Sequence, residues 1–301
     1  MKAQNYSKGI FWAAFASTMW GISGTILQYI SQGQNIPATW FLSVRTLGAG
    51  TILLIIGWFQ ERNRIFSLFK SWRLVGWLVA YALLGLMANL FTFYMSIKTG
   101  NASAATILQY LSPLFIVLGA LVFKRELPMR SDLIAFAIAL LGVFLAITKG
   151  NIHTLAVPVP SIIWGILSGV TAACYVVLPR AIVAEHSPIV VLGWGMFISG
   201  ILFNLARPFW VDTPPITPQL VASIGSVILV GTILAFSTLL YSLNFAPSAV
   251  ISIVDAVQPV VTFILSIIFF HLQISVMEVI GSVLVIVAVY LLQRLRQTGS
   301  D

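Results

Sequence analysis

Long apolar runs separated by short polar stretches repeat along the whole chain. A helix needs about 20 mainly apolar residues to cross the hydrocarbon core of a bilayer. Windows of that kind predict ten spans, near residues 9–30, 38–59, 72–95, 103–123, 131–148, 159–182, 188–207, 219–242, 249–270 and 274–293. We therefore expect an all-α integral membrane protein with ten transmembrane helices.

The basic residues gather on one side of this arrangement. With the N-terminus placed in the cytoplasm and each span reversing the side, 12 of the 16 Lys and Arg residues lie inside and 3 lie outside, while Arg45 falls within a span. Cytoplasmic loops of membrane proteins are enriched in Lys and Arg. The pattern predicts a multi-pass protein of the cytoplasmic (inner) membrane with both termini in the cytoplasm.

Composition excludes several other classes of protein. Of the 301 residues 59% are hydrophobic and only 8% are charged, whereas soluble domains carry about 25% charged residues. The net charge of +8 forms no basic patch, so nucleic acid is not an expected partner, and the single cysteine, Cys174, excludes an intrachain disulfide. The sequence contains no HExxH, GxSxG, CxxC or P-loop motif, so we expect no enzyme activity, no metal, no cofactor and no direct drive by ATP.

The chain contains an internal repeat. A shift of 146 positions aligns the third to fifth spans with the eighth to tenth without a gap, and it pairs Gly85 with Gly231 and Pro113 with Pro259. This predicts two five-helix domains, at residues 1–148 and 149–301. Since five is an odd number, the second copy enters the membrane with the opposite orientation.

Inverted repeats are a recurrent plan of secondary transporters, in which the substrate site lies near the midplane between the two halves. Two similar halves can exchange conformations, which gives outward-open and inward-open states of comparable energy. The repeat therefore favours a transporter driven by an ion or substrate gradient. A membrane scaffold or a membrane-embedded enzyme is the alternative outside transport.

Several short motifs carry a resemblance to a known family. They are Trp20-Gly21, Arg45, the Tyr94-to-Pro113 stretch ending QYLSP, KREL at Lys124–Leu127, YSLNFAPSAV at 241–250 and VQPV at 257–260. With these motifs the chain resembles the EamA proteins of the drug/metabolite transporter superfamily over essentially its full length. Leu272 replaces the second copy of Glu126, and Gly195 lies roughly where a second Arg45 is expected. The resemblance implies export of amino acids or other small metabolites, with uptake in some branches.

Asp255 and Gln109 occupy equivalent places in the two repeats. Asp255, Gln258 and Pro259 lie on one helical face, and Gln109, Ser112 and Pro113 repeat the spacing. A proline inside a helix leaves the carbonyl four residues earlier without its usual donor, which suggests that the Asp255 and Gln109 carbonyls are free to bind a substrate amine. The competing interpretation is that Pro113 and Pro259 only kink the helices for packing.

An ionisable residue within a span is costly and is a functional hypothesis by default. For Asp255, three readings stay open: a proton carrier, a partner for a cationic group of the substrate, or a structural partner of a polar side chain. Arg45 is expected near the outer face, where it either ties its helix to backbone carbonyls or binds a substrate carboxylate. Their depths predict no direct contact between Arg45 and Asp255.

Other polar and aromatic side chains complete the candidate substrate site. Those with helical spacing in the first span are Trp20, Ser23 and Gln28. The third span offers Asn89 and Tyr94, and the aromatic candidates elsewhere are Tyr175, Trp194 and Tyr241. We expect a small-molecule substrate, either an amino acid that is exported on the family's precedent, or an organic cation or drug. The proton is a candidate coupling ion, and the sequence leaves the oligomeric state open.

Overall fold

The computed structural model describes residues 6–151, 155–211, 213–246, 250–251, 254–273 and 275–298. These residues form helices and connections, with no β-strand among them. The helices of the first half are α1 (Tyr6–Gln28), η1 (Tyr29–Gly33), α2 (Ala38–Glu61), η2 (Arg62–Lys70), α3 (Trp72–Ala80), η3 (Tyr81–Met87), α4 (Ala88–Thr99), α5 (Ala102–Gln109), α6 (Ser112–Gly119), η4 (Ala120–Lys124) and α7 (Arg130–Thr148). Those of the second half are α8 (Val159–Val177), α9 (Arg180–Val183), α10 (Pro188–Ala206), α11 (Pro218–Ile228), η5 (Leu229–Leu234), α12 (Ala235–Ser242), α14 (Val257–Phe270) and α15 (Val276–Thr298).

Seven helical segments in the described part of the chain are long and apolar enough to cross a membrane. They are Ser7–Gly33, Ala38–Lys70, Trp72–Thr99, Ala102–Lys124, Val159–Val183, Pro188–Ala206 and Pro218–Ser242. Three shorter apolar helices occupy Asp132–Thr148, Val257–Phe270 and Val276–Leu291. The prediction of an all-helical membrane protein is confirmed, although residues 249, 252 and 253 of the predicted ninth span lie outside the described residues.

Two of the long segments contain a π-helical turn at matching places. η3 covers residues 81–87 and η5 covers residues 229–234, and the offset of 146 carries the first range onto residues 227–233. Such turns inside α-helices are rare and are frequent at functional sites. Gly85 lies within η3 and its repeat partner Gly231 within η5, so this local irregularity recurs in both halves.

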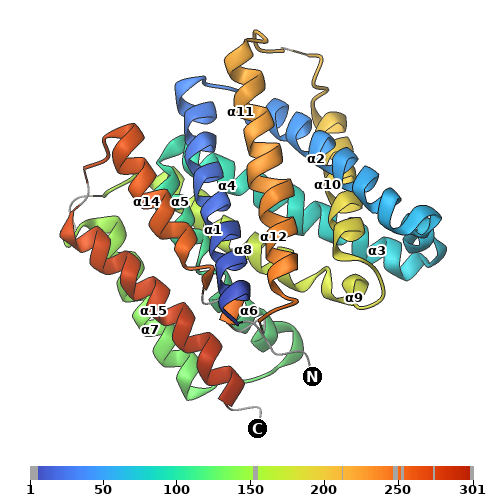
Figure 1. Ribbon diagram of the computed structural model, residues 1–301. Coiled ribbons are helices and arrows are strands. Elements are labelled where there is room, and N and C mark those ends of the chain that lie inside the picture. Colours follow the sequence, from blue (N-terminus) through green and yellow to red (C-terminus); the bar gives the residue numbers. More distant parts are fainter. Residues whose placement is uncertain are drawn as a thin grey trace.

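The two halves pack on each other reciprocally. α2 packs against α10 and α7 against α15, while α1 packs against α12 and α14, and α8 against α4 and α5. Figure 1 shows α7 and α15 as a side-by-side pair, and α1 beside α12 and α14. A Cβ at Gly281 would lie only 2.4 Å from the carbonyl oxygen of Gly142, so glycine is needed for the close approach of α7 and α15. Small residues at helix crossings are a general device of membrane proteins.

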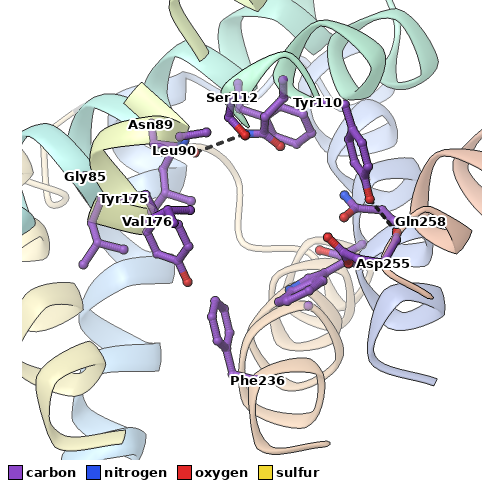
Figure 2. A pocket seen from close by; sticks show the side chains of 18 of the residues that line it. Gly85, Asn89, Leu90, Tyr110, Ser112, Tyr175, Val176, Phe236, Asp255 and Gln258 are labelled. Carbon is purple, nitrogen blue, oxygen red and sulfur yellow. Dashed lines mark hydrogen bonds between the residues drawn. The ribbon is translucent and has the colours of Figure 1, made fainter. Parts of the chain in front are cut away.

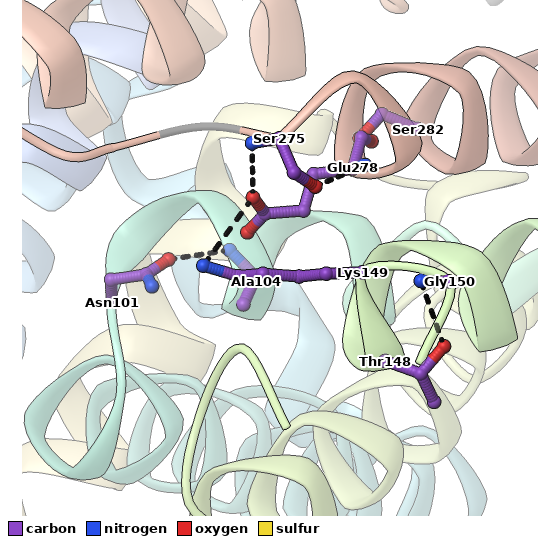
Figure 3. Close-up of polar contacts among 8 residues, drawn as sticks. All are labelled: Asn101, Ala104, Thr148, Lys149, Gly150, Ser275, Glu278 and Ser282. Atoms are coloured by element: carbon purple, nitrogen blue, oxygen red, sulfur yellow. Dashed lines mark hydrogen bonds and ion pairs between the residues drawn. The ribbon is translucent and has the colours of Figure 1, made fainter. Parts of the chain in front are cut away.

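The helices of this pair begin with the same cap. In α7 the backbone N–H of Met129 donates to Asp132 Oδ2 at 2.9 Å, and before α15 the N–H of Ser275 donates to Glu278 Oε2 at 2.7 Å. Asp132 and Glu278 are 146 positions apart. Glu278 also forms an ion pair of 3.6 Å with Lys149 at the end of α7 (Figure 3). The cap satisfies backbone donors at the helix start, and the ion pair joins the two helices.

Candidate functional site

A cavity of about 740 Å³ lies between the two halves and takes its walls from both of them. Its walls include nine of the thirteen side chains predicted to bind substrate. These nine are Trp20, Ser23, Arg45, Asn89, Gln109, Ser112, Tyr175, Asp255 and Gln258. Pro113 also lines the cavity, whereas Pro259, the residue after Gln258, is buried and is not among the lining residues.

Gln109 is held in a polar cluster at one wall. Its Nε2 donates to Asn89 Oδ1 at 3.2 Å and to Ser168 Oγ at 3.0 Å. Asn89 Nδ2 in turn reaches the Ser168 carbonyl at 3.5 Å. Three elements, α4, α5 and α8, are joined through this cluster. The Gln109 amide is therefore fixed in orientation by neighbours from both halves.

Asp255 is held in an equivalent way at the opposite wall. Ser17 Oγ of α1 donates to Asp255 Oδ1 at 3.0 Å. The Tyr110 hydroxyl donates to the Asp255 carbonyl (Figure 2). A serine of α8 thus holds Gln109 of the first repeat, and a serine of α1 holds Asp255 of the second. Each half supplies the support for the other half's polar residue.

The carbonyl of Asp255 is not free, which corrects the sequence prediction. It accepts the Gln258 N–H at 2.9 Å as well as the Tyr110 hydroxyl. The reason is that the chain turns at Asp255–Ala256 before α14 begins at Val257, so the bond closes over three residues instead of four. In the first half the chain likewise turns at Tyr110–Leu111 between α5 and α6.

The two prolines begin helices and do not kink continuous ones. Pro113 is the second residue of α6, and Pro259 is the third residue of α14. In the first turn of a helix an N–H has no intrahelical partner, so proline removes nothing there. The release of the Asp255 carbonyl expected from Pro259 is therefore wrong, whereas the release of the Gln109 carbonyl stays a prediction. The prolines still mark the breaks that place Gln109 and Asp255.

Arg45 is buried in the same cavity wall as a cation without an acidic neighbour. Its side chain is 7% exposed, and its Nε has no hydrogen-bond partner. Within the residues that the structure describes, the two ion pairs are Lys124–Glu126 and Lys149–Glu278. The expected tie to backbone carbonyls is not formed there. Arg45 and Asp255 line one cavity, although they start from different depths of their helices.

Aromatic rings cover the wall between these polar groups. The Phe236 ring lies 5.2 Å from Trp20 and 6.2 Å from Tyr175, centroid to centroid, and Tyr175 lies 5.9 Å from Tyr81. Figure 2 shows Asp255 and Tyr110 on one side of the open space and Asn89 and Tyr175 on the other. The cavity thus combines a cation, a carboxylate, amides and an aromatic wall.

Four predicted binding residues lie elsewhere. Gln28, which directly follows the cavity residue Leu27, accepts the Ala102 N–H at 2.9 Å. The Tyr94 hydroxyl donates to the Ile36 carbonyl at 2.9 Å inside a packed cluster, and Trp194 Nε1 donates to the Ile65 carbonyl at 2.9 Å.

Tyr241, the fourth, is 43% exposed and packs edge-on against Trp12 and Phe245. All four side chains point away from the cavity because their helices turn them toward neighbouring elements. They hold the helices together or cover their ends.

Three further residues that line the cavity were not predicted from the sequence: Tyr110, Phe236 and Arg180. The internal repeat could have identified Phe236, because it is the repeat partner of Leu90, which lines the cavity as well. From the sequence, Arg180 is only one of the 12 basic residues expected on the cytoplasmic side. Tyr110 follows directly after Gln109, and only the turn at that point brings its hydroxyl to Asp255.

Comparison with known proteins agrees with this architecture. The EamA-like transporter family matches residues 7–148 and again residues 159–294. An uncharacterized inner membrane transporter, YicL of Salmonella typhimurium, is 28% identical over 288 residues, which cover 95% of each chain. One solved crystal structure superposes with a TM-score of 0.61 at 19% identity and covers 94% of each chain, so it supports the fold alone.

Proposed function

Because the chain belongs to the EamA-like transporter family, present twice along its length, we propose that it is a secondary transporter of the inner membrane that moves small metabolites by alternating access. The family membership expected from the motifs is confirmed, and it makes the chain a membrane transporter of the drug/metabolite type. It also points to transport and not to catalysis. The substrate class, export as the direction of transport, and alternating access as the mechanism are what we propose beyond the family membership.

We further propose ten spans arranged as two inverted five-helix repeats. The seven long helical segments and the three shorter apolar helices supply ten elements. The offset of 146, the reciprocal packing of the halves and the recurrence of the π-helical turn support an internal two-fold relation. The distribution of Lys and Arg supports a topology with both termini in the cytoplasm.

The proposal about the substrate class rests on Arg45, which is buried and forms no ion pair with any described residue. A cation inside a membrane protein is costly unless it finds a partner. The cavity also holds the Asp255 carboxylate. A substrate with one carboxylate and one ammonium group, as in an amino acid, would neutralise both groups at once. We propose that Arg45 binds the carboxylate and that Asp255 faces the ammonium group.

Arg45→Gln tests this assignment. In proteoliposomes, the KM of Arg45→Gln for a transported amino acid should rise roughly 10- to 100-fold, since a hydrogen bond to a charged group contributes about 1.5–3 kcal/mol. The matching amine, which lacks the carboxylate, should be transported equally by wild type and variant. Equal losses for both compounds would show that Arg45 acts on structure.

A panel of amino acids, organic cations and nucleosides identifies the cargo. Preferred transport of organic cations would indicate that the protein takes up or exports drugs, with Asp255 and the aromatic wall as the binding groups. Absence of flux for every class would favour a scaffold or an enzyme. Flux driven by an imposed pH gradient would identify the proton as coupling ion.

A further inference from the structure

The first helix of each half makes equivalent contacts with the other half. A Cβ at Gly9 would lie 2.5 Å from the Cβ of Ala246, and a Cβ at Gly100 would lie 2.7 Å from that of Ser161. Since Gly100 and Ala246 are 146 positions apart, Gly9 and Ser161 are counterparts, which gives α1 and α8 an offset of 152.

A second pair of contacts gives the same offset. Gly231 lies against Ser23, and its repeat partner Gly85 lies against Tyr175. Ser23 and Tyr175 are again 152 positions apart. With this offset, η1 at residues 29–33 corresponds to residues 181–185 and so to α9. Gln28 corresponds to Arg180, and Gln32 corresponds to Ala184.

At the η1 end of the cavity, side-chain hydrogen bonds hold α1 and η1 against the connection between α4 and α5. Gln28 Oε1 accepts the Ala102 N–H at 2.9 Å. Gln32 Nε2 donates to the carbonyls of Ile97 at 2.8 Å and Gly100 at 2.7 Å. η1 packs on α4. The nearest cavity residue, Leu27, is only 3% exposed, so this end is closed.

At the other end of the cavity, the equivalent element is α9, and hydrogen bonds of this kind are not formed there by the described side chains. α9 packs on α3 and α10. Arg180 lines the cavity, is exposed, and makes no ion pair or side-chain hydrogen bond with any described residue. The neighbouring cavity residue Val176 is 40% exposed. The cavity therefore opens at the α9 end, which the proposed topology places at the cytoplasmic side.

We propose that Arg180 is the inner gating residue, whose guanidinium binds the carbonyls at residues 243–246 when the cavity opens to the outside. These residues are the repeat counterparts of 97–100, which bind Gln32 in the closed outer end. Ala184, in the place of Gln32, has no donor. Arg180 lies four residues earlier, about 6 Å away along a helix, a distance that an arginine side chain spans.

This gate rests on the proposed function, because it requires the two halves to exchange conformations. The outer latch is made by amides and the inner latch by a guanidinium. Arginine carries five donors and keeps its charge at all physiological pH values. The inner gate is therefore expected to depend on one side chain, whereas the outer latch is shared between Gln28 and Gln32.

The test measures the accessibility of two reporter cysteines in a Cys174→Ser background. Leu27→Cys reports opening to the outside and Val176→Cys reports opening to the inside, each labelled by a membrane-impermeant maleimide in vesicles of known orientation. Arg180→Ala should lower outside labelling of Leu27→Cys roughly tenfold, since hydrogen bonds to a charged group are lost from the outward-open state. Arg180→Lys should retain much of the labelling, because a lysine side chain has nearly the same reach and also donates to carbonyls.

Two further variants complete the experiment. Gln32→Ala should raise outside labelling of Leu27→Cys by weakening the outer latch, and Arg130→Ala, which removes an exposed charge predicted at the same side, should leave it unchanged. If Gln32→Ala shifts labelling and Arg180→Ala does not, the gate is wrong while alternating access stands. If Leu27→Cys stays unlabelled from outside in every variant, alternating access fails, and the gate fails with it.

Discussion

The contact between Gly231 and Ser23 gives a sharp prediction about how closely α1 and η5 must approach. A Cβ at Gly231 would lie 2.1 Å from Ser23 Oγ and 2.5 Å from Ser23 Cβ. Carbon atoms in contact prefer a separation of about 3.5–4.0 Å, so the helices must part by roughly 1 Å. Ser23 is 3% exposed, and its Cβ cannot move aside without the backbone.

Gly231→Ala should therefore be destabilising even though alanine is the better helix former. Overpacking of this kind costs about 1–3 kcal/mol, against a gain of about 0.5–1 kcal/mol from helix propensity. We expect a net loss of about 1–2 kcal/mol in the free energy of unfolding, measured by denaturant titration in mixed micelles. Because both residues line the cavity, transport should fall as well.

Gly225→Ala is the matched control in the same helical segment. A Cβ at Gly225 would meet nothing within 4 Å, so this variant should be as stable as wild type or slightly more stable. The double variant Ser23→Gly/Gly231→Ala moves the methyl group to the other helix and should recover most of the lost stability. Equal stability of Gly231→Ala and Gly225→Ala would refute the close approach.

Two further predictions separate structural residues from binding residues. Glu278→Gln keeps an acceptor for the cap but removes the ion pair to Lys149, so the free energy of unfolding should fall by less than about 1 kcal/mol; Glu278→Ala also removes the cap and should lose about 1 kcal/mol more. Similar values for the two variants in thermal unfolding would contradict the cap. Trp194→Phe loses the bond to the Ile65 carbonyl and should lower stability by about 1 kcal/mol with unchanged KM in transport assays, whereas a raised KM would return Trp194 to the binding site.

The apolar pattern predicted the helices well because the bilayer imposes a single length scale on every span. It did not reveal the interruptions within them. Hydropathy is the same for a continuous helix and for one that turns at Tyr110–Leu111, since the turn residues are themselves apolar or aromatic. The π-helical turns at Gly85 and Gly231 lie against Tyr175 and Ser23 of other helices, and one segment of sequence does not contain such contacts.

Side-chain direction explains which site predictions succeeded. Asn89 lines the cavity and Tyr94 does not, because five residues on an α-helix place two side chains about 140° apart. The same separation divides Phe236, which lines the cavity, from Tyr241, which does not. Helical spacing alone contained this information. Arg180 required the structure, because its meaning comes from the contrast between η1 and α9.

The most direct test of the central claim is flux through purified protein in proteoliposomes, compared between wild type and Asp255→Asn. We expect saturable transport of at least one amino acid by wild type, and loss of that transport in Asp255→Asn with unchanged folding by size-exclusion chromatography. The asparagine keeps the acceptor for Ser17 and removes only the charge. Normal flux through Asp255→Asn, or no amino acid flux in wild type, would contradict the claim that this cavity carries a zwitterionic metabolite.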